Sequence, residues 1–225
     1  MDLELLYKNI GIKEMNAMQK SAFKASDNQQ DIVLLSPTGS GKTLAFLIPI
    51  LRDLKPDVKG VQCLILVPAR ELALQIESVF KSMKVDFKVT CCYGGHNTKI
   101  EQNTLVEAPA VLIGTPGRIA YHLRNENFDP AIAKALVLDE FDKALELGFQ
   151  EDMSFIINQL INVNHRILTS ATEMQDIPEF VGLENDKTVS YLKNKEVKPD
   201  LHMKLVNTIS EDKLDTLFNL ICKIG

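Results

Sequence analysis

The sequence alternates between short apolar runs and stretches with helical spacing of apolar residues, and a polar cluster follows most of the runs. Continuous apolar runs of strand length begin near residues 32, 62, 88, 110, 135 and 166. Such runs suit parallel strands that helices cover on both faces. Strands regularly followed by helices form right-handed crossovers. The pattern therefore predicts an α/β domain of three layers, with a mostly parallel central sheet flanked by helices.

The two ends of the chain depart from this repeat. Before the first run, two helices are expected around Gly11. After Thr172 the pattern weakens, and the expected elements there are a short helical piece at 177–181, a last strand at 188–192, a polar connection at 194–200 and an extended pair at Leu205-Val206. A final helix is expected from Ser210, whose side chain can cap its first turn.

Composition excludes some classes of protein. The chain has 225 residues, of which 45% are hydrophobic, enough for a substantial core. Its apolar runs are too short to span a bilayer and no secretory signal is evident, so a cytoplasmic monomer without membrane contact is expected. The net charge of −5 gives no general attraction for nucleic acid. Cys63, Cys91, Cys92 and Cys222 lack paired Cys-x-x-Cys spacing, and we expect reduced, buried packing residues.

A glycine-rich segment, Ser-Pro-Thr-Gly-Ser-Gly-Lys-Thr at 36–43, joins the first apolar run to a helix. A strand that feeds such a turn directs several N–H groups and the positive end of the helix dipole toward one point, which suits a phosphate. Lys42 can place its ammonium on the β- and γ-phosphates, and the Thr43 hydroxyl can ligate Mg²⁺. The strict pattern has glycine where Ser36 stands. The predicted phosphate-binding residues are Thr38, Gly39, Ser40, Gly41, Lys42 and Thr43.

An ordinary strand-to-helix turn is the alternative interpretation of this segment. It would explain the glycines, which tolerate backbone conformations that a Cβ penalises. It does not explain a Gly-Lys-Thr triplet at the start of a helix. A phosphate-binding loop is therefore the prediction that we follow.

Two acidic residues, Asp139 and Glu140, follow the apolar run at 135–138. Carboxyl ends of parallel strands meet at one edge of a sheet, so Asp139 is expected opposite the phosphate loop, where it can hold Mg²⁺. Glu140 can orient or deprotonate a water that attacks the γ-phosphorus. Together with Lys42, this pair predicts a hydrolase. The alternative is that both acids only cap the next helix.

Further polar residues stand at other strand ends. Ser170 and Thr172 carry hydroxyls that could hydrogen-bond Asp142, although small polar residues after a strand are commonly turn residues. Arg70 and Arg118, together with the N–H groups of Gly95 and Gly117, could contact a sugar-phosphate backbone. The alternative for such arginines is solvent exposure or pairing with carboxylates.

Taken together and in this order, these clusters resemble the DEAD-box RNA helicases over almost the whole chain. The matching motifs are the phosphate loop at 36–43, Pro-Ala-Arg-Glu-Leu-Ala at 68–73, Gly-Gly at 94–95, Thr-Pro-Gly-Arg at 115–118, Asp-Glu-Phe-Asp at 139–142 and Ser-Ala-Thr at 170–172. Phe141 replaces the family's alanine and Ala69 replaces a threonine. The resemblance implies a RecA-like fold, ATP and Mg²⁺ as cofactors, and RNA-stimulated ATP hydrolysis with local duplex unwinding.

The resemblance also implies roles for single residues. Gln19, which by itself would be taken for a solvent-facing helix residue, would read the adenine edge. The surrounding segment departs from the family at Ile12, Met15 and Ala17. The implied RNA contacts are Pro68, Arg70, Gly95, Thr115, Gly117 and Arg118. The implied coupling residues between the nucleotide and RNA sites are Asp142, Ser170 and Thr172.

A second RecA-like lobe with arginines completes the ATP site in that family, and no such motif follows Thr172. We therefore expect residues 1–206 to be the amino-terminal ATP-binding lobe and 207–225 to be a linker and first helix leading to an absent second lobe. Such a fragment should bind ATP or ADP but hydrolyse ATP poorly. The alternatives are a DNA-directed motor of the same superfamily, a non-hydrolysing nucleotide-gated RNA-binding scaffold, and a small-molecule kinase.

Overall fold

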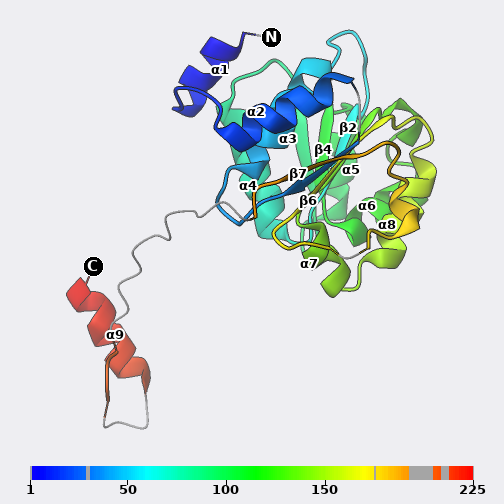
Figure 1. Cartoon of the computed structure of the whole chain (residues 1–225). Coiled ribbons are helices and arrows are strands. Elements are labelled where there is room, and N and C mark those ends of the chain that lie inside the picture. Colours follow the sequence, from blue (N-terminus) through cyan, green and yellow to red (C-terminus); the bar gives the residue numbers. More distant parts are fainter. Residues whose placement is uncertain (1, 29–30, 175, 193–204, 209–212, 225) are drawn as a thin grey trace. The chain divides into compact units, whose positions relative to one another are not determined.

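The computed structural model describes residues 2–28, 31–174, 176–192, 205–208 and 213–224. The chain divides into two units, Met1–Lys193 and Asn194–Gly225 (Figure 1). The first unit contains all the candidate site residues named above. Within the described residues, no helix is both long and apolar enough to cross a membrane.

The first unit is built on one sheet whose seven strands lie in the order β3-β4-β2-β5-β6-β1-β7. The strands are β1 (Ile32–Leu35), β2 (Cys63–Leu66), β3 (Val89–Cys92), β4 (Val111–Gly114), β5 (Ala135–Leu138), β6 (His165–Ser170) and β7 (Lys187–Ser190). Every neighbouring pair is parallel. The predicted parallel sheet is confirmed, including its last strand.

Helices connect these strands along the chain. They are α1 (Leu3–Ile10), α2 (Ala17–Ala25), α3 (Lys42–Asp53), α4 (Arg70–Ser82), α5 (Thr98–Val106), α6 (Pro116–Arg124), α7 (Phe141–Glu146) and α8 (Gln150–Gln159), with short 3₁₀ turns η1 (Ser26–Asn28), η2 (Pro130–Ile132) and η3 (Glu179–Val181). The pattern did not predict α7, which begins within the acidic motif.

Side chains of the inner strands alternate between two cores. In β1, Ile32 and Leu34 pack in a cluster with residues of α1 to α4, whereas Val33 and Leu35 pack in a second cluster with residues of α5 to α8. Figure 1 shows the sheet between these two groups of helices. Because both faces are covered, β1 and β2 consist of buried apolar residues, whereas the edge strand β7 is mostly exposed and polar. The predicted three-layer arrangement is confirmed.

The strand order divides the carboxyl edge of the sheet into two halves. Ser36 N donates to Ser170 O at 3.1 Å, which places the glycine-rich loop beside the end of β6, and β5 adjoins β6. On the other half, Thr115 N donates to Cys92 O at 3.1 Å and β4 pairs with β2. The phosphate loop and the acidic motif thus share one half, and the two arginine-bearing strand ends share the other.

The second unit contains α9 (Lys213–Ile224). The expected connection at 194–200 and the expected helix start at Ser210 lie outside the described residues. Leu205 and Val206 are described but belong to no strand. Cys222 is exposed, so the expectation that all four cysteines are buried is wrong for this one. The apolar residues expected on one helix face, Leu214, Leu217, Phe218 and Ile221, are exposed.

Candidate functional site

The glycine-rich loop has the backbone that its glycines permit. Gly39 and Gly41 have φ values of 83° and 89°, in the left-handed region that side chains disfavour. Lys42 is buried at the start of α3, and its Nζ donates to Ser36 O at 2.7 Å and Pro37 O at 2.9 Å. The ammonium therefore lies within the curve of its own loop, where a bound phosphate would compete with these carbonyls.

A cavity of about 350 Å³ opens beside this loop. It brings Lys42 together with Asp139 and Glu140, which come from the distant end of β5. The residues that line it are Ile10, Thr38, Gly39, Gly41, Lys42, Thr43, Leu44, Leu72, Gln75, Val79, Ser82, Asp139 and Glu140. Of the predicted phosphate-loop residues, Ser40 is outside this lining.

Asp139 and Glu140 are held by a residue that the sequence patterns did not indicate. Thr169, fully buried in β6, donates from Oγ1 to Asp139 Oδ1 at 2.6 Å and accepts from Glu140 N at 3.1 Å. Glu140 itself has φ 48° and ψ 50°, a left-handed conformation. The usable signal was a threonine inside the otherwise apolar run that precedes Ser170.

Burial raises the pKa of Asp139 to about 6, although the Thr169 hydrogen bond and the charge of Lys42 both favour its ionised form. Asp139 and Thr43 line the same cavity. Hard oxygen donors are the ligands that Mg²⁺ prefers, so this donor set fits the predicted metal. The metal itself remains a prediction.

Gln19 is buried, so the expectation of a solvent-facing residue is wrong. Its Oε1 accepts from Asn16 N at 2.9 Å, and its Nε2 donates to Gly41 O at 3.1 Å. Asn16 Nδ2 in turn donates to Ser40 O at 3.0 Å. The capping residues of α2 thereby hold the glycine-rich loop in place through its carbonyl groups. Gln19 is not among the residues lining the cavity, and its predicted contact with adenine stays a prediction.

A second set of hydrogen bonds joins the acidic motif to the end of β6. Thr172 Oγ1 donates to Asp142 Oδ2 at 2.8 Å. Ser170 Oγ accepts from Thr172 N at 3.1 Å and donates to Thr172 O at 2.7 Å. Thr172 thus makes the contact with Asp142, whereas the Ser170 hydroxyl hydrogen-bonds to the backbone of Thr172.

The other half of the sheet edge carries a hollow of about 590 Å³. Its lining residues are Arg70, Gly94, Thr115, Gly117, Arg118, Tyr121 and Phe149. Arg70 is exposed and its guanidinium carbon lies 5.0 Å from the centroid of the Tyr93 ring. Gly95 is exposed but outside this lining, and Pro68 is buried. Arg118 is paired with the buried carboxylate of Glu101.

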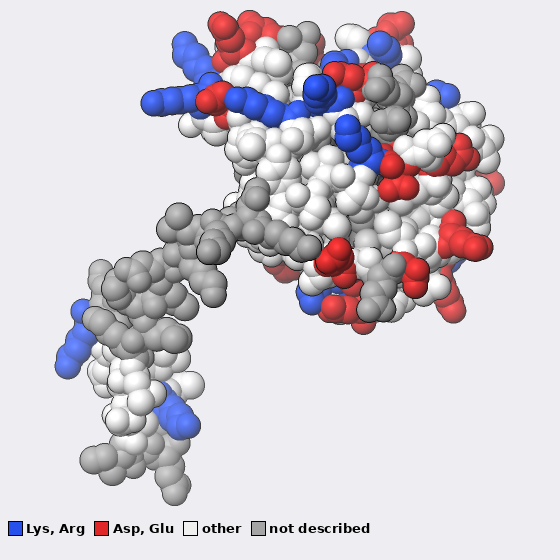
Figure 2. All heavy atoms as spheres, viewed as in Figure 1, with Lys and Arg blue, Asp and Glu red and all other residues white. Residues whose placement is uncertain are grey.

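Charge is mixed over the surface of the first unit. On the described part of the face in Figure 2, Lys and Arg side chains are interspersed with Asp and Glu side chains. Attraction for a polyanion would therefore depend on local groups such as Arg70 and backbone N–H groups rather than on a general positive field.

A family model described as DEAD/DEAH box helicase matches residues 16–180. The chain belongs to this family. The resemblance to DEAD-box helicases that the motifs indicated is thereby confirmed, and the matched range contains both halves of the sheet edge.

Several curated DEAD-box relatives are similar over most of this chain. ATP-dependent RNA helicase DeaD of Escherichia coli (strain K12) is 34% identical over 167 residues, which cover 73% of this chain and 27% of that protein. DEAD-box ATP-dependent RNA helicase RhpA of Helicobacter pylori (strain B128) is 36% identical over 179 residues, which cover 78% of this chain and 36% of that protein. ATP-dependent rRNA helicase RRP3 of Encephalitozoon cuniculi (strain GB-M1) is 34% identical over 195 residues, covering 85% and 49%. The chain therefore spans less than half the length of these relatives.

Solved DEAD-box structures share the fold. A hypothetical ATP-dependent RNA helicase from Sulfolobus tokodaii has a TM-score of 0.76 at 28% identity and covers 85% of this chain and 57% of its own. The yeast DEAD-box splicing factor Prp28 has a TM-score of 0.76 at 28% identity, covering 83% and 47%. These likenesses confirm the predicted RecA-like fold.

Proposed function

We propose that this chain is the ATP-binding lobe of an RNA helicase, and that ATP with Mg²⁺ binds in the cavity beside the glycine-rich loop. The observation that carries the proposal is the convergence of Lys42, Thr43, Asp139 and Glu140 on that one cavity. A phosphate that entered would meet the loop N–H groups, the start of α3 and the lysine ammonium together.

The residues have separate tasks in this proposal. Lys42 exchanges its two loop carbonyls for phosphate oxygens. Glu140 orients or deprotonates the attacking water. Thr169 holds Glu140 in place by accepting a hydrogen bond from the Glu140 backbone N–H. Mg²⁺, when bound by Thr43 and Asp139, would supply positive charge to the phosphates.

Hydrolysis would need more than this lobe. Stabilising charge from an arginine contributes on the order of 10³ or more to phosphoryl transfer. We propose that a second RecA-like lobe supplies it, so that residues 1–225 alone bind nucleotide, turn over slowly and do not unwind RNA. The matched relatives are longer than this chain. A cytoplasmic location and a monomeric state remain predictions of the sequence.

Single-stranded RNA would bind to the other half of the sheet edge, where Arg70 and the exposed Gly94-Gly95 turn lie. Contacts there would reach sugar and phosphate rather than base edges, so little sequence preference is expected. The Thr172–Asp142 bond joins the nucleotide half to its neighbouring surface and is the proposed coupling contact.

Titration of a fluorescent ADP analogue with Mg²⁺ tests nucleotide binding directly. K42A should weaken the affinity by about tenfold or more, because it removes a charged partner of the phosphates. K20A, which removes an exposed lysine that pairs with Glu14 and does not line the cavity, is the matched control and should bind as the unchanged protein does. Equal affinity of K42A and the unchanged protein would contradict the proposed site.

Hydrolysis is tested in a protein that has both lobes. E140Q should bind nucleotide normally and lose about 10²-fold or more in RNA-stimulated turnover. Unchanged turnover in E140Q would contradict the role proposed for Glu140. Absence of turnover in the unchanged two-lobed protein would favour a non-hydrolysing scaffold, and equal stimulation by DNA would favour a DNA-directed motor. RNA-stimulated turnover by residues 1–225 alone would refute the need for a second lobe.

A further inference from the structure

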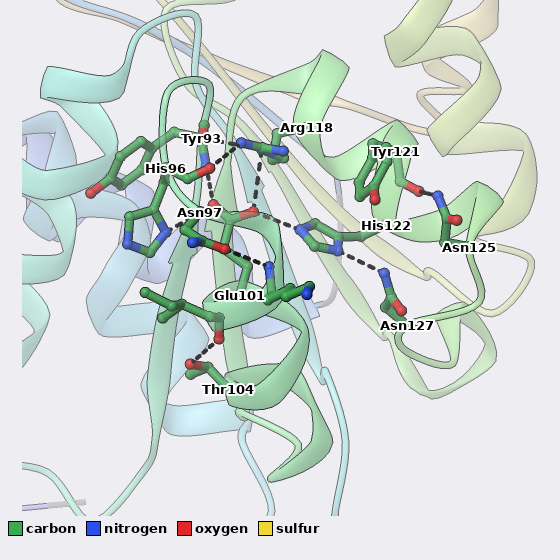
Figure 3. Close-up of polar contacts among 12 residues, drawn as sticks. Tyr93, His96, Asn97, Glu101, Thr104, Arg118, Tyr121, His122, Asn125 and Asn127 are labelled. Carbon is green, nitrogen blue, oxygen red and sulfur yellow. Dashed lines mark hydrogen bonds and ion pairs between the residues drawn. The ribbon is translucent and has the colours of Figure 1, made fainter.

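A buried carboxylate lies behind the proposed RNA surface, away from the nucleotide cavity. Glu101 belongs to α5, and its side chain is 0% exposed (Figure 3). Burying a charge is costly unless partners compensate it. The nucleotide chemistry described above does not use this residue, so its partners indicate what it does.

Three hydrogen-bond contacts and one ion pair surround the two carboxylate oxygens. Oε1 accepts from Tyr93 N at 3.0 Å and contacts His96 Nδ1 at 3.2 Å. Oε2 lies 3.2 Å from Arg118 Nε and 2.8 Å from His122 Nε2. Arg118 Nε donates its proton to Tyr93 O, so Arg118 compensates the charge of Glu101 as an ion pair, and the other three contacts can supply hydrogen bonds to the carboxylate.

The His122 ring is oriented by a contact on the side that faces away from Glu101. Asn127 Nδ2 lies 2.9 Å from His122 Nδ1. With the amide donating to Nδ1, the ring proton is on Nε2 and points toward Glu101. Figure 3 shows His122 between Glu101 and Asn127, with Arg118 above the Glu101 carboxylate.

Arg118 is bound to the same turn as Glu101. Its Nε donates to Tyr93 O at 3.1 Å and its Nη2 donates to His96 O at 2.6 Å. The two residues therefore hold both ends of the segment 93–96, while its central Gly94 and Gly95 stay exposed. The guanidinium is mostly buried and its charge faces a carboxylate.

A metal ion is the other chemistry that this cluster could suit. The ligand atoms of Cys92, Glu101 and His122 all lie within 4.8 Å of one another. However, Arg118 already supplies the positive charge at Glu101, and burial raises the pKa of the Cys92 thiol, which keeps it protonated. A cation would have to displace existing donors, so the geometry favours a network that fixes the backbone.

We infer that Glu101 is a positioning residue for RNA binding, which locks Arg118 onto the turn 93–96 so that Gly94, Gly95 and Arg70 meet the phosphates. Arg118 acts through the turn rather than as a direct phosphate ligand. This inference rests on the proposed RNA function of the same surface and differs from the RNA contact that the motif resemblance implied for Arg118.

The substitution E101Q separates the two roles because they predict opposite signs. It removes a negative charge beside Arg118, so RNA affinity would rise if Arg118 contacted phosphates directly. If Glu101 positions the turn, the new amide N–H groups face existing donors, the turn shifts, and affinity falls. We expect a loss of about fivefold or more, equivalent to roughly one net hydrogen bond.

The assay is fluorescence anisotropy of a labelled oligouridylate titrated with the whole chain at several salt concentrations. R70Q should weaken binding and lower the slope of log K against log salt by about 0.7, the value for one lost phosphate contact on a single strand. E101Q should weaken binding and keep the slope. E107Q, at the exposed end of the same helix region, should change neither.

Folding is monitored in the same samples by thermal melting and by the affinity for a fluorescent ADP analogue, which E101Q should leave within about twofold. If E101Q does not fold, N127A tests the same network, because Asn127 contacts His122 and not Glu101 itself. N127A should also weaken RNA binding. Tighter or unchanged RNA binding by a folded E101Q or N127A would overturn the inference. Absence of RNA binding by the unchanged protein would overturn the proposed RNA function itself.

Discussion

Replacing Thr169 with valine removes one hydroxyl from the fold and keeps the shape of the side chain. That hydroxyl donates to Asp139 at 2.6 Å and accepts from Glu140 N at 3.1 Å, in a position without solvent exposure. The substitution therefore leaves a buried carboxylate and a partly buried N–H each short of one partner.

The size of the effect follows from these two losses. An unsatisfied buried N–H costs about 1–3 kcal/mol. The carboxylate can escape its loss by taking a proton, and because its pKa is about 6, protonation at pH 7 costs about 1.4 kcal/mol. We expect a total loss of about 2–4 kcal/mol in the free energy of unfolding at pH 7. For a domain of this size each kcal/mol lowers the Tm by about 2–4 °C.

The sign of the pH dependence is also fixed. The folded-state pKa of Asp139 is raised above its ordinary value, so between the two values the native state binds more protons than the unfolded state, and stability falls as pH rises. T169V removes a hydrogen bond that favours the ionised form of Asp139, so it raises the pKa further and extends the fall in stability to higher pH. The difference between T169V and the unchanged protein should therefore shrink below pH 6.

Urea denaturation at pH 7.5 and 5.0 measures these differences, with T169S as the matched control. Serine keeps the hydroxyl and loses one methyl group, so it should retain most of the stability at both pH values and preserve the pH dependence. A T169V protein within about 0.5 kcal/mol of the unchanged protein at pH 7.5 would refute the reasoning.

Three further outcomes are expected. A Cβ at Gly41 would lie 2.6 Å from Gln19 Nε2, whereas one at Gly39 meets nothing within 4 Å, so G41A should destabilise the fold by about 1 kcal/mol or more beyond G39A in urea titrations; equal losses would contradict the contact. Burial lowers the pKa of His165, so the unfolded state binds the proton more readily and the free energy of unfolding should fall as pH drops below 6.5. H165Q should make this fall smaller in urea titrations at several pH values. An equal pH dependence in H165Q and the unchanged protein would exclude His165 as the cause. Cys222 is exposed while the other cysteines are buried, so a maleimide should modify one thiol per native chain, and modification of more without denaturant would contradict this.

The elements of the sheet were predictable because strand burial leaves a direct mark on sequence. The runs at 32–35 and 135–138 coincide with β1 and β5, since strands covered on both faces are apolar at every position. The grouping of motifs at one edge followed from the parallel connections alone. The helix α7 was missed because its first turn overlaps the acidic motif and its six residues carry little periodicity.

What the sequence did not indicate depends on contacts between distant segments. Gln19 is buried because a loop 22 residues further along the chain covers it, and helical spacing carries no information about such a cover. Thr169 meets Asp139 only because β6 lies next to β5. Glu101 on α5 contacts Arg118 and His122, which both lie on α6. An acidic residue on a short helix is ordinarily expected to face solvent, so the sequence did not indicate this contact.

The strand order has a consequence for engineering. β2, β3 and β4 with their three helices form one uninterrupted stretch, residues 63–124, and that stretch supplies the whole arginine-bearing half of the edge except Phe149. The flanking parts of the chain supply the glycine-rich loop and the acidic motif. A cassette cut at these two boundaries would move the proposed RNA-facing residues of one relative into another while the glycine-rich loop and the acidic motif come from the recipient. Residues of α4 that line the nucleotide cavity would move with the cassette, and Asn127 would have to be added to keep the Glu101 network complete.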